Sequence, residues 1–566
     1  MKARTHLPAL VALLLGSTGC GFALDTDGVL VANECELDSD CPGALCDSTL
    51  GMCIAPTGDP LSLWLEVTPA SDPVRGTPTT RGLGPFLVDG PSQAHLELPA
   101  PINVIGNVRM AGTGEAVTAN LRFVREPAFV GAPAVVVETS TVTEPVPAFD
   151  GMPADYALRV VAEEDYLLVV EPTGEWAARV PPLRLARAVP GGGDFVRLNI
   201  EYPADMPELS GVVMDGAEAP VDDLLVRVVD VDTGLAASST SITGAEGEPG
   251  TFRVVIDPTV TNWVIRIRAG AEDSFFPTLF ADPAFLFPDE FGNVRILVPM
   301  LSHTCYVGTV GIEADATGFE TVPGAVLSLV STDVFDGSTG VTGSFRTTAT
   351  ADATGEFRVE VLPGTYEVLV TPPDMRGDVG VLAEVVRIEV PPGEDCLLGQ
   401  RFQLPPRAAL AGSVRTPDGR EMPSATVNAH ALGWEPASGV SPAARYNRSN
   451  DTTTGPTGLF TLPLDIGSYD VAIKPPPGSR FPWLVRPDMT FGRSDVTVMQ
   501  DFELSAPVPL AGTVVEAGPE AMPSAGAEIR AFAIVELADG RRRALPVART
   551  VAEADGSYML LLPARL

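Results

Sequence analysis

Residues 357–373 read FRVEVLPGTYEVLVTPP, and apolar and polar side chains alternate along both halves of this stretch. A period of two is typical of strands with one buried face, and Pro363-Gly364 favours a hairpin turn between the halves. Residues 459–476, LFTLPLDIGSYDVAIKPP, repeat the pattern around Asp465 to Ser468. No window longer than about 12 residues shows helical periodicity without an intervening Pro or Gly. The sequence therefore predicts antiparallel β structure.

This pattern recurs along the chain with one period. A glycine in an apolar strand is spaced by 105, 97, 104 and 100 residues, at Gly106, Gly211, Gly308, Gly412 and Gly512. An aromatic residue that opens an alternating strand is spaced by 96, 105, 103 and 98 residues, at Tyr156, Phe252, Phe357, Phe460 and Tyr558. Another aromatic residue follows in four of the units, at Tyr166, Trp263, Tyr366 and Tyr469. Three anchors with one period indicate tandem antiparallel sandwiches of about one hundred residues each.

The composition limits the classes of function. Of 566 residues, 73 are acidic and 37 are Lys or Arg, which gives a net charge of −36. This balance argues against nucleic acid as a partner, because affinity for phosphate backbones comes mainly from cationic contacts. Hydrophobic residues make up 45% of the chain, enough for several cores, while 55 glycines and 54 prolines disfavour long helices.

The N-terminus predicts export. Lys2 and Arg4 precede an apolar run and small residues, the pattern of a secretory signal peptide over 1–19. Ser17-Thr18-Gly19-Cys20 resembles a bacterial lipobox, with Ser17 where leucine is usual. The resemblance implies a lipid on Cys20 and, since no aspartate follows it, an outer-membrane location facing the periplasm or the cell surface. The alternative is an ordinary signal peptide with a chance cysteine. No other stretch reaches ~18 consecutive apolar residues, so the lipid would be the only membrane attachment.

Four further cysteines lie in a short segment, CELDSDCPGALCDSTLGMC, at Cys35, Cys41, Cys46 and Cys53. A segment of this size cannot bury a core, so two disulfides are expected to hold it. A four-thiolate zinc site is the alternative, although the CxxC pairs that zinc ribbons favour are missing. The run resembles the cysteine-rich modules that follow the signal in many myxobacterial surface lipoproteins.

The repeat resembles a known domain family. Its pattern has four motifs in a fixed order: Gly-x-Val, Pro-x-x-x-x-Val, Asp-x-x-Gly-x-Phe and Pro-Gly-x-Tyr-x-Val-x-Val. This order is similar to that of the carboxypeptidase regulatory-like domain, most clearly in the units from Gly308 and Gly412. The resemblance covers residues 102–566 and implies seven-stranded, prealbumin-like Greek-key sandwiches. In that fold the first and last strands come close, which implies a disulfide between Cys305 and Cys396. It would close a loop of about ninety residues and contribute roughly 4–5 kcal/mol.

The anchors divide the chain into segments. We expect a signal peptide over 1–19, a lipidated N-terminus with the cysteine-rich module over 20–59, and a linker with partial β structure over 60–101. Complete sandwiches are expected over 102–205, 206–301, 302–405 and 406–505, and an incomplete one over 506–566. Proline lies in the short joints between units, so the array should be a stiff rod of about 150 Å.

The fifth unit lacks the part that follows Tyr558 in the repeat. Aligned on Phe460, the fourth unit continues for about 45 residues more, whereas the fifth stops at Leu566. Unpaired strand edges would invite pairing with another chain. Three explanations remain open: a truncated gene, a fragment of a longer array, or a partner that supplies the missing strands.

Candidate residues for chemistry are few. His95, His303 and His430 lie on or near predicted strands, and no HExxH, GxSxG or P-loop pattern is present, so we expect no enzyme, no cofactor and no metal. Asp352 and Asp555 could bind calcium, but hairpin turns explain them as well.

Aromatic residues are the candidates for ligand binding. Residues 275–291 hold six phenylalanines, and Phe481, Trp483 and Phe491 lie two repeats later, with Trp434 in a loop between. They either fill sandwich cores or form an exposed platform for sugar rings; Trp434, Phe481 and Trp483 are the possible ligand-binding set. The sequence thus predicts a non-enzymatic envelope lipoprotein that acts as a rod-like spacer, adhesin or assembly component. Its partners would be the membrane, through the lipid, and envelope proteins or polysaccharide; the alternative is a carbohydrate-binding accessory protein.

Overall fold

The computed structural model describes residues 31–566 except 71–79, 100, 128, 130–133, 143–145, 148–150, 152, 192, 194, 246, 271–274, 287, 290–291, 300–302, 315–317, 332, 335–339, 390–395, 433–449, 493–495, 518–520 and 537–541. Within these residues the chain is nearly all β. Its helices are short: α1 (Trp176–Arg179), and the 3-10 helices η1 (Asp38–Asp40) and η2 (Pro283–Phe285). The predicted all-β class and the tandem sandwiches are confirmed.

Sandwich 3 shows the unit in its complete form, with seven strands at positions that we call A to G in chain order. These are β25 (Thr304–Ala314), β27 (Val326–Ser331), β28 (Val341–Thr350), β29 (Glu356–Val361), β30 (Gly364–Thr371), β31 (Leu382–Ile388) and β32 (Cys396–Gln403), with β26 (Gly318–Thr321) beside A. One sheet has the order D-A-G, with A and G parallel, and the other has the order C-B-E-F. Alternate side chains of both sheets meet in one apolar core.

Sandwiches 1, 2 and 4 have the same two sheets. Sandwich 1 has β7 (Pro101–Gly106), β8 (Val108–Met110), β9 (Ala119–Arg125), β10 (Val135–Ser140), β11 (Val146–Pro147), β12 (Pro153–Ala154), β13 (Tyr156–Val161), β14 (Glu164–Pro172), β15 (Leu183–Val189), β16 (Phe195–Arg197) and β17 (Ile200–Tyr202). Sandwich 2 has β18 (Glu208–Met214), β19 (Leu224–Asp230), β20 (Ser241–Ile242), β21 (Thr251–Val255), β22 (Trp263–Ala269), β23 (Thr278–Ala281) and β24 (Val294–Leu297). Sandwich 4 has β33 (Ala408–Arg415), β34 (Thr426–Ala431), β35 (Asp451–Thr453), β36 (Leu459–Leu464), β37 (Gly467–Lys474), β38 (Leu484–Phe491), β39 (Thr497–Met499) and β40 (Phe502–Glu503).

The repeated glycine is explained by the contact between strands A and G. A Cβ atom at Gly412 would lie 1.9 Å from the carbonyl oxygen of Gln500, and one at Gly512 would lie 1.7 Å from that of Ala94. The other three anchor glycines meet a carbonyl oxygen of their own G strand at 1.9 to 2.3 Å. Only glycine permits this approach of the two backbones.

Sandwich 5 is built from both ends of the chain. Residues 508–562 supply positions A to D, and residues 61–98 supply E, F and G: β41 (Val508–Glu516), β43 (Glu528–Glu536), β44 (Arg542–Val551), β45 (Ser557–Leu562), β3 (Leu61–Thr68), β4 (Arg81–Val88), β5 (Ser92–Gln93) and β6 (Leu96–Leu98), with β42 (Met522–Pro523) beside A. Strand β3 pairs antiparallel with β43, and β5 and β6 pair parallel with β41. The β structure expected within 60–101 is present, but this segment is not a linker and 506–566 is not an incomplete sandwich, because each segment holds the strands that the other lacks.

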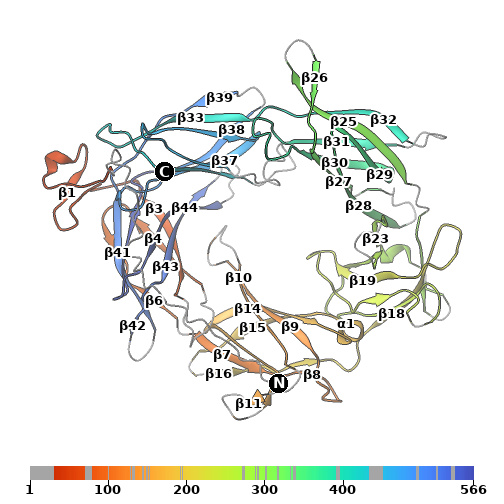
Figure 1. Ribbon diagram of the computed structural model, residues 1–566. Coiled ribbons are helices and arrows are strands. Elements are labelled where there is room, and N and C mark those ends of the chain that lie inside the picture. The colour runs from red at the N-terminus through yellow and green to blue at the C-terminus, as the bar shows by residue number, and fades with distance from the viewer. Residues whose placement is uncertain are drawn as a thin grey trace, which may run out of the picture.

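The array is a closed ring rather than the predicted rod. Figure 1 shows the five sandwiches around one centre, with the C-B-E-F sheets toward the inside and the D-A-G sheets outside. Successive units are turned relative to one another instead of continuing in a straight line. Units joined head to tail form a ring when their successive rotations close, and here they close at the fifth unit.

Neighbouring sandwiches are held by polar and strand contacts. Strand β23 of sandwich 2 pairs with β28 of sandwich 3, so that their C-B-E-F sheets form one eight-stranded sheet. Between sandwiches 1 and 2, Arg184 lies 3.6 Å from Asp230. Asp465 of sandwich 4 accepts a hydrogen bond from the Val381 backbone N–H at 3.1 Å, and Arg543 of sandwich 5 lies 2.8 Å from Asp470 of sandwich 4.

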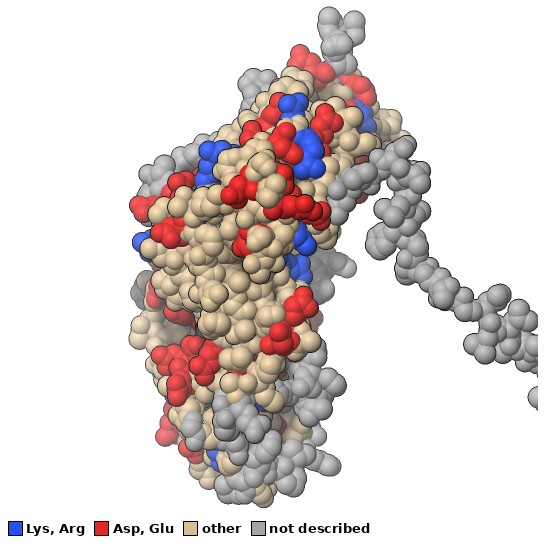
Figure 2. Space-filling model, turned by 90° about the vertical axis from the view of Figure 1, so that its left-hand side faces the viewer, with Lys and Arg blue, Asp and Glu red and all other residues tan. Residues whose placement is uncertain are grey.

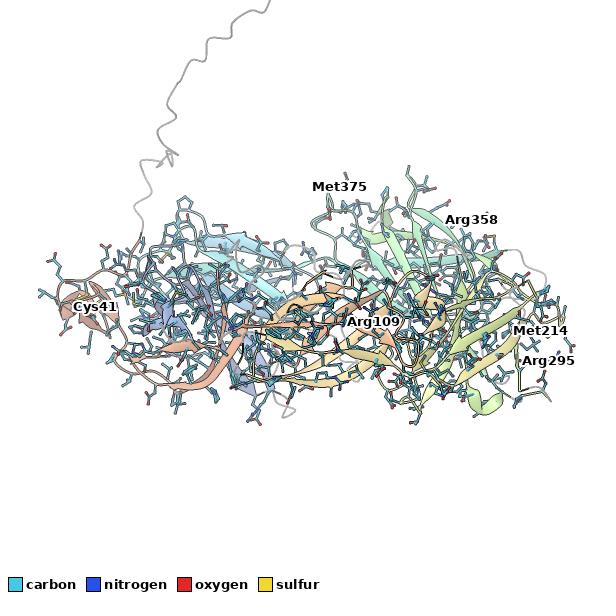
Figure 3. The ribbon with its side chains drawn as sticks, turned by 90° about the horizontal axis from the view of Figure 1, so that it is seen from below. Cys41, Arg109, Met214, Arg295, Arg358 and Met375 are labelled. Atoms are coloured by element: carbon cyan, nitrogen blue, oxygen red, sulfur yellow. A yellow bond between two sulfur atoms is a disulfide. The ribbon has the colours of Figure 1, made fainter. Side chains whose placement is uncertain are left out.

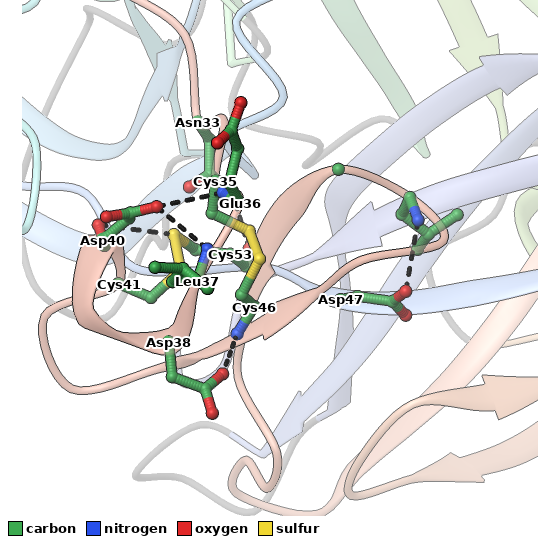
Figure 4. Close-up of a disulfide and its surroundings, with 12 residues drawn as sticks. Asn33, Cys35, Glu36, Leu37, Asp38, Asp40, Cys41, Cys46, Asp47 and Cys53 are labelled. Carbon is green, nitrogen blue, oxygen red and sulfur yellow. Dashed lines mark hydrogen bonds between the residues drawn. A yellow bond between two sulfur atoms is a disulfide. The ribbon is translucent and has the colours of Figure 1, made fainter.

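The cysteine-rich module, which we call the collar, comprises residues 33–55 with η1, β1 (Leu45–Asp47) and β2 (Met52–Ile54). Its four cysteines form the disulfides Cys35–Cys46 and Cys41–Cys53, so no thiolate is left for zinc. Carboxylates complete the fold of the collar: Asp40 accepts hydrogen bonds from the backbone N–H groups of Glu36 and Leu37, and Asp38 from that of Cys46 (Figure 4). In the edge-on view the ring is shallower than it is wide, and the collar at Cys41 projects from one end, opposite Met214 and Arg295 (Figure 3).

Candidate functional site

The structure separates the predicted site residues. Cys305 and Cys396 form a disulfide between strands A and G of sandwich 3, the pairing expected for this fold. Cys20 and Trp434 lie outside the described residues. Phe481 is 7% exposed in the core of sandwich 4, so it cannot belong to an exposed platform. Trp483 is half-buried, and the Nζ atom of Lys474 lies 4.7 Å from the centre of one of its faces.

The segment 275–291 includes β23, the strand that joins sandwich 2 to sandwich 3. Phe280 lies on β23, opposite Thr342 of the next sandwich. Phe275 and Phe285 are each 54% exposed, while Phe287 and Phe291 lie outside the described residues. Phe280 thus has a structural place in the joint, while Phe275 and Phe285 are the exposed rings of the segment.

Two crevices lie at joints of the ring. The crevice between the collar and sandwich 4 has a volume of about 30 Å³, which is room for roughly one or two waters. The cavity between sandwiches 1 and 2 is larger, about 190 Å³, and is lined by polar groups that include Asn120, Glu171, Arg227 and Ser238. Ligand pockets usually measure about 300–1,000 Å³, so neither crevice has the size of a small-molecule site.

The most prominent feature of sandwich 5 is the set of contacts between residues 58–98 and residues 508–566, which we call the seam. Its register runs from Leu63 opposite Ala533 to Thr68 opposite Glu528. Leucines of β3 and β6 share one core with the aliphatic side chains of β41, β43 and β45. Residues near Asp59 and Ala564 lie where other sandwiches have their D–E turn, since the Asp59 N–H donates to the Ala564 carbonyl at 2.8 Å.

Aromatic rings join the seam to sandwich 1. Trp64 of β3 and Phe532 of β43 face each other across the strands. Phe129, from a loop of sandwich 1, is 6% exposed and packs on both, with ring centroids 5.6 Å from Trp64 and 5.1 Å from Phe532. This cluster fastens the two chain halves to the neighbouring sandwich.

Two ion pairs also cross the seam, each with at least one buried partner. Arg81, 3% exposed on β4, lies 3.5 Å from Glu516 on β41; burial lowers the pKa of the Arg81 guanidinium, and the Glu516 charge opposes this shift. Glu66, 8% exposed, lies 3.3 Å from Arg530. Each pair takes one residue from each end of the chain, so separating the ends would leave buried charges without partners.

Two signals in the sequence could have revealed the seam. The segment 61–67 reads LSLWLEV, which alternates as strand E does in other units, and 60–101 has about the length that the fifth unit lacks. The expected aromatic residue is replaced by Leu63, which hid the match. Tyr366 and Tyr469 each donate a hydroxyl hydrogen bond to the D–E turn at 2.8 Å, and sandwich 5 has no continuous turn to accept one.

None of the helices among the described residues has the length and hydropathy of a transmembrane span. Comparison with known protein families and with characterised proteins gave no match.

Solved structures gave distant likenesses. The Bacillus anthracis TIE protein is 10% identical with a TM-score of 0.17, and the alignment covers 69% of each chain. A streptococcal ancillary pilin is 14% identical with a TM-score of 0.22, covering 53% of this chain and 99% of the pilin. The Streptococcus agalactiae minor pilin GBS52 is 11% identical with a TM-score of 0.22, covering 36% and 96%.

Proposed function

We propose that the chain is a non-enzymatic cell-envelope lipoprotein that acts as a ring-shaped scaffold, adhesin or assembly component at the outer membrane. The observation that carries the proposal is the closed ring of five sandwiches, with a disulfide-held collar on its rim directly after the predicted lipidation site. A ring of sandwiches offers a large, stiff surface for protein contacts, whereas the two crevices described above are small.

The collar supports an anchoring role because it is fastened to sandwich 4. The Asn33 backbone N–H donates to Ser479 at 2.7 Å, and the guanidinium of Arg480 donates to the Leu50 carbonyl at 3.0 Å. Val31 packs against the sandwich 4 core. Twelve residues lie between Cys20 and Asn33, which makes thirteen residue-to-residue steps. Extended chain spans at most ~3.6 Å per residue, so a lipid on Cys20 would keep this part of the rim within about 45 Å of the membrane.

The positions of the histidines support the non-enzymatic part. The Nδ1 atom of His95 lies 2.9 Å from the Thr513 hydroxyl, and Nε2 of His303 lies 2.9 Å from the Phe275 carbonyl oxygen. His430 stands opposite Asp470 between β34 and β37. His95 and His303 thus each have a hydrogen-bond partner, and His430 lies in a regular strand pair, which accounts for these three histidines without a catalytic role.

Mass spectrometry and fractionation test the anchor. We expect the native protein to fractionate with the outer membrane and to begin at an acylated Cys20, and Cys20→Ser to release it. External protease on intact cells then decides between the periplasmic and surface faces. Electron microscopy of single particles should show rings. Soluble, unacylated native protein would disprove the lipoprotein, and straight rods would disprove the scaffold geometry.

A further inference from the structure

The two complementary halves of sandwich 5 meet at the seam, although nearly the whole chain lies between them in sequence. The Tyr558 hydroxyl donates to the Ala94 carbonyl at 2.8 Å across 464 residues of sequence. Strands E, F and G join sandwich 1 through two residues between Leu98 and Pro101, and strands A to D join sandwich 4 through four residues between Glu503 and Val508. Each half is therefore tied closely to a different neighbour.

We propose that sandwich 5 is also an assembly site between copies of this chain, in which β3–β6 of one chain complete β41–β45 of another. The partner is a second copy because its segment 61–98 has the sequence that the vacant positions fit. The pairing of β3 with β43, the A–G contact at Gly512 and the ion pair Glu66–Arg530 would all form unchanged. Such exchange of identical elements is a low-cost route to oligomers.

Folding order makes the exchange accessible. Residues 61–98 are synthesised first, and their partners in 508–562 follow only after four complete sandwiches. Until then β3 carries an unpaired inner edge, where sandwich 4 has its E strand β37 paired with β34. Open strand edges are templates for another chain, and non-local pairing is slow because loop closure precedes it.

Closure of sandwich 5 within one chain competes with exchange between chains, and the protein concentration shifts the balance between them. Two segments tethered in one chain meet at an effective concentration of about millimolar, so dilute chains should close on themselves. Chains crowded on a surface or refolded at high concentration should exchange more often. The net charge of −36 adds repulsion between copies, and Figure 2 shows carboxylates scattered over the sandwich 5 side of the ring with fewer cations among them. Salt screens this repulsion, so exchange should rise with ionic strength.

Complementary variants test the proposal in full-length mature chains that carry Cys20→Ser. Leu65→Asp places a charge in the core from the E strand, and Gly512→Arg blocks strand A against Ala94. Neither variant alone can form a correctly packed sandwich 5. Refolded together, they can form a heterodimer with one intact sandwich 5, made from Leu65 of one chain and Gly512 of the other. Light scattering after size exclusion should show about tenfold more dimer in the mixture than in either variant alone.

The matched control uses the equivalent positions in sandwich 4, which one continuous segment encodes. Val471→Asp and Gly412→Arg should show no complementation when mixed. A Leu65/Gly512 mixture that contains no more dimer than the separate variants would overturn the proposal.

A second test leaves the fold intact. Thr68 and Glu528 are register partners across β3 and β43, so Thr68→Cys with Glu528→Cys reports which chains share a sandwich. On non-reducing denaturing gels, closed rings run as monomers and exchanged chains as covalent dimers. The dimer fraction should rise when refolding concentration is raised from about 1 to about 100 µM. Monomer alone at every concentration would refute exchange even if the first pair of variants misfolds.

Discussion

Sandwiches 4 and 5 have the same two sheets but differ in how the chain builds them. Residues 408–503 form sandwich 4 in one continuous run, whereas sandwich 5 joins 61–98 to 508–562. The position of the break is specific: it falls in the D–E turn, between Leu562 and Leu61.

The comparison shows which repeated residues stabilise every sandwich and which stabilise only an uninterrupted D–E turn. Glycine is kept in strand A of both sandwiches, because A and G touch in either arrangement. Tyr469 bonds to the carbonyl of Asp465 in the D–E turn of sandwich 4, and sandwich 5, which lacks this turn, has Leu63 instead. The aromatic residue of strand D gains a hydroxyl in sandwich 5, where Tyr558 reaches across the seam, while sandwich 4 has Phe460.

The largest expected effect comes from deleting residues 59–98. Without strands E, F and G, the remaining strands of sandwich 5 lose half of their core and should unfold, while sandwich 4 keeps its own seven strands. Hydrogen exchange should show amides of 508–562 losing protection, with little change in 408–474. In the full chain we expect the two sandwiches to be protected alike. Protection of 508–562 in the deletion variant would contradict the composite sandwich.

The next effect concerns how strands A and G are held together. In sandwich 3 they are linked by Cys305–Cys396 across 91 residues of sequence, whereas in sandwiches 4 and 5 they are not covalently linked. Replacing both cysteines by serine should destabilise sandwich 3 by about 4–5 kcal/mol, because the unfolded chain regains loop entropy. Denaturant unfolding followed by hydrogen exchange would locate the loss. A loss spread evenly over all five sandwiches would mean that the ring unfolds as one unit.

A methyl group in the A–G contact should have a smaller effect. Gly412→Ala and Gly512→Ala each force a Cβ atom against a carbonyl oxygen, which should cost about 1–3 kcal/mol or more. Gly512→Ala should also open the ring and increase the hydrodynamic radius, since its strand contact joins the chain ends. Gly377→Ala, at a position with no atom within 4 Å of the added Cβ, is the control. Equal radii for the Gly412 and Gly512 variants would argue that the seam does not hold the ring closed.

The sequence was sufficient for the sandwich and insufficient for the ring. Alternation around Pro363-Gly364 and the periodic glycines depend on contacts within one unit, so local pattern revealed them. Closure depends on the angle between successive units and on pairing between residues more than 400 apart, for example Arg530 with Glu66 at a separation of 464. No local pattern encodes that angle.

The candidate site shows the same limit. Phe481 and Trp483 are neighbours in sequence, yet one enters the core and the other lies half-buried beneath Lys474. Aromatic clustering alone does not distinguish these environments. The cysteines were more informative, because a disulfide requires proximity and the fold resemblance specified which strands are adjacent.

Replacing Tyr558 by phenylalanine removes one hydroxyl and gives strand D of sandwich 5 the residue type that sandwich 4 has there, at Phe460. Tyr558→Phe deletes the hydrogen bond to the buried Ala94 carbonyl and should destabilise the seam by about 1 kcal/mol. Tyr469→Phe deletes the bond to Asp465 and should cost a similar amount within sandwich 4. Only the Tyr558 variant should raise exchange of amides in both 92–98 and 508–516. If the two variants loosened the same strands, the hydroxyl of Tyr558 would have no special role at the junction.

The smallest expected effect is on the pH dependence of stability, which should differ between sandwiches 4 and 5. Asp501 follows the G-strand contact of sandwich 4 and accepts hydrogen bonds from the Ser413 hydroxyl and backbone N–H, which lower the pKa of its carboxyl below 3.8. The equivalent pair in sandwich 5 is His95 with Thr513. Because the folded pKa is lowered, this contribution to stability is present above pH 3.8 and is lost as the pH falls through the folded value. The stability difference between the native chain and Asp501→Asn should therefore shrink below pH 3.8 in sandwich 4, as followed by exchange of amides in 408–415. A difference that stayed constant with pH would mean that the charge of Asp501 contributes nothing to this contact.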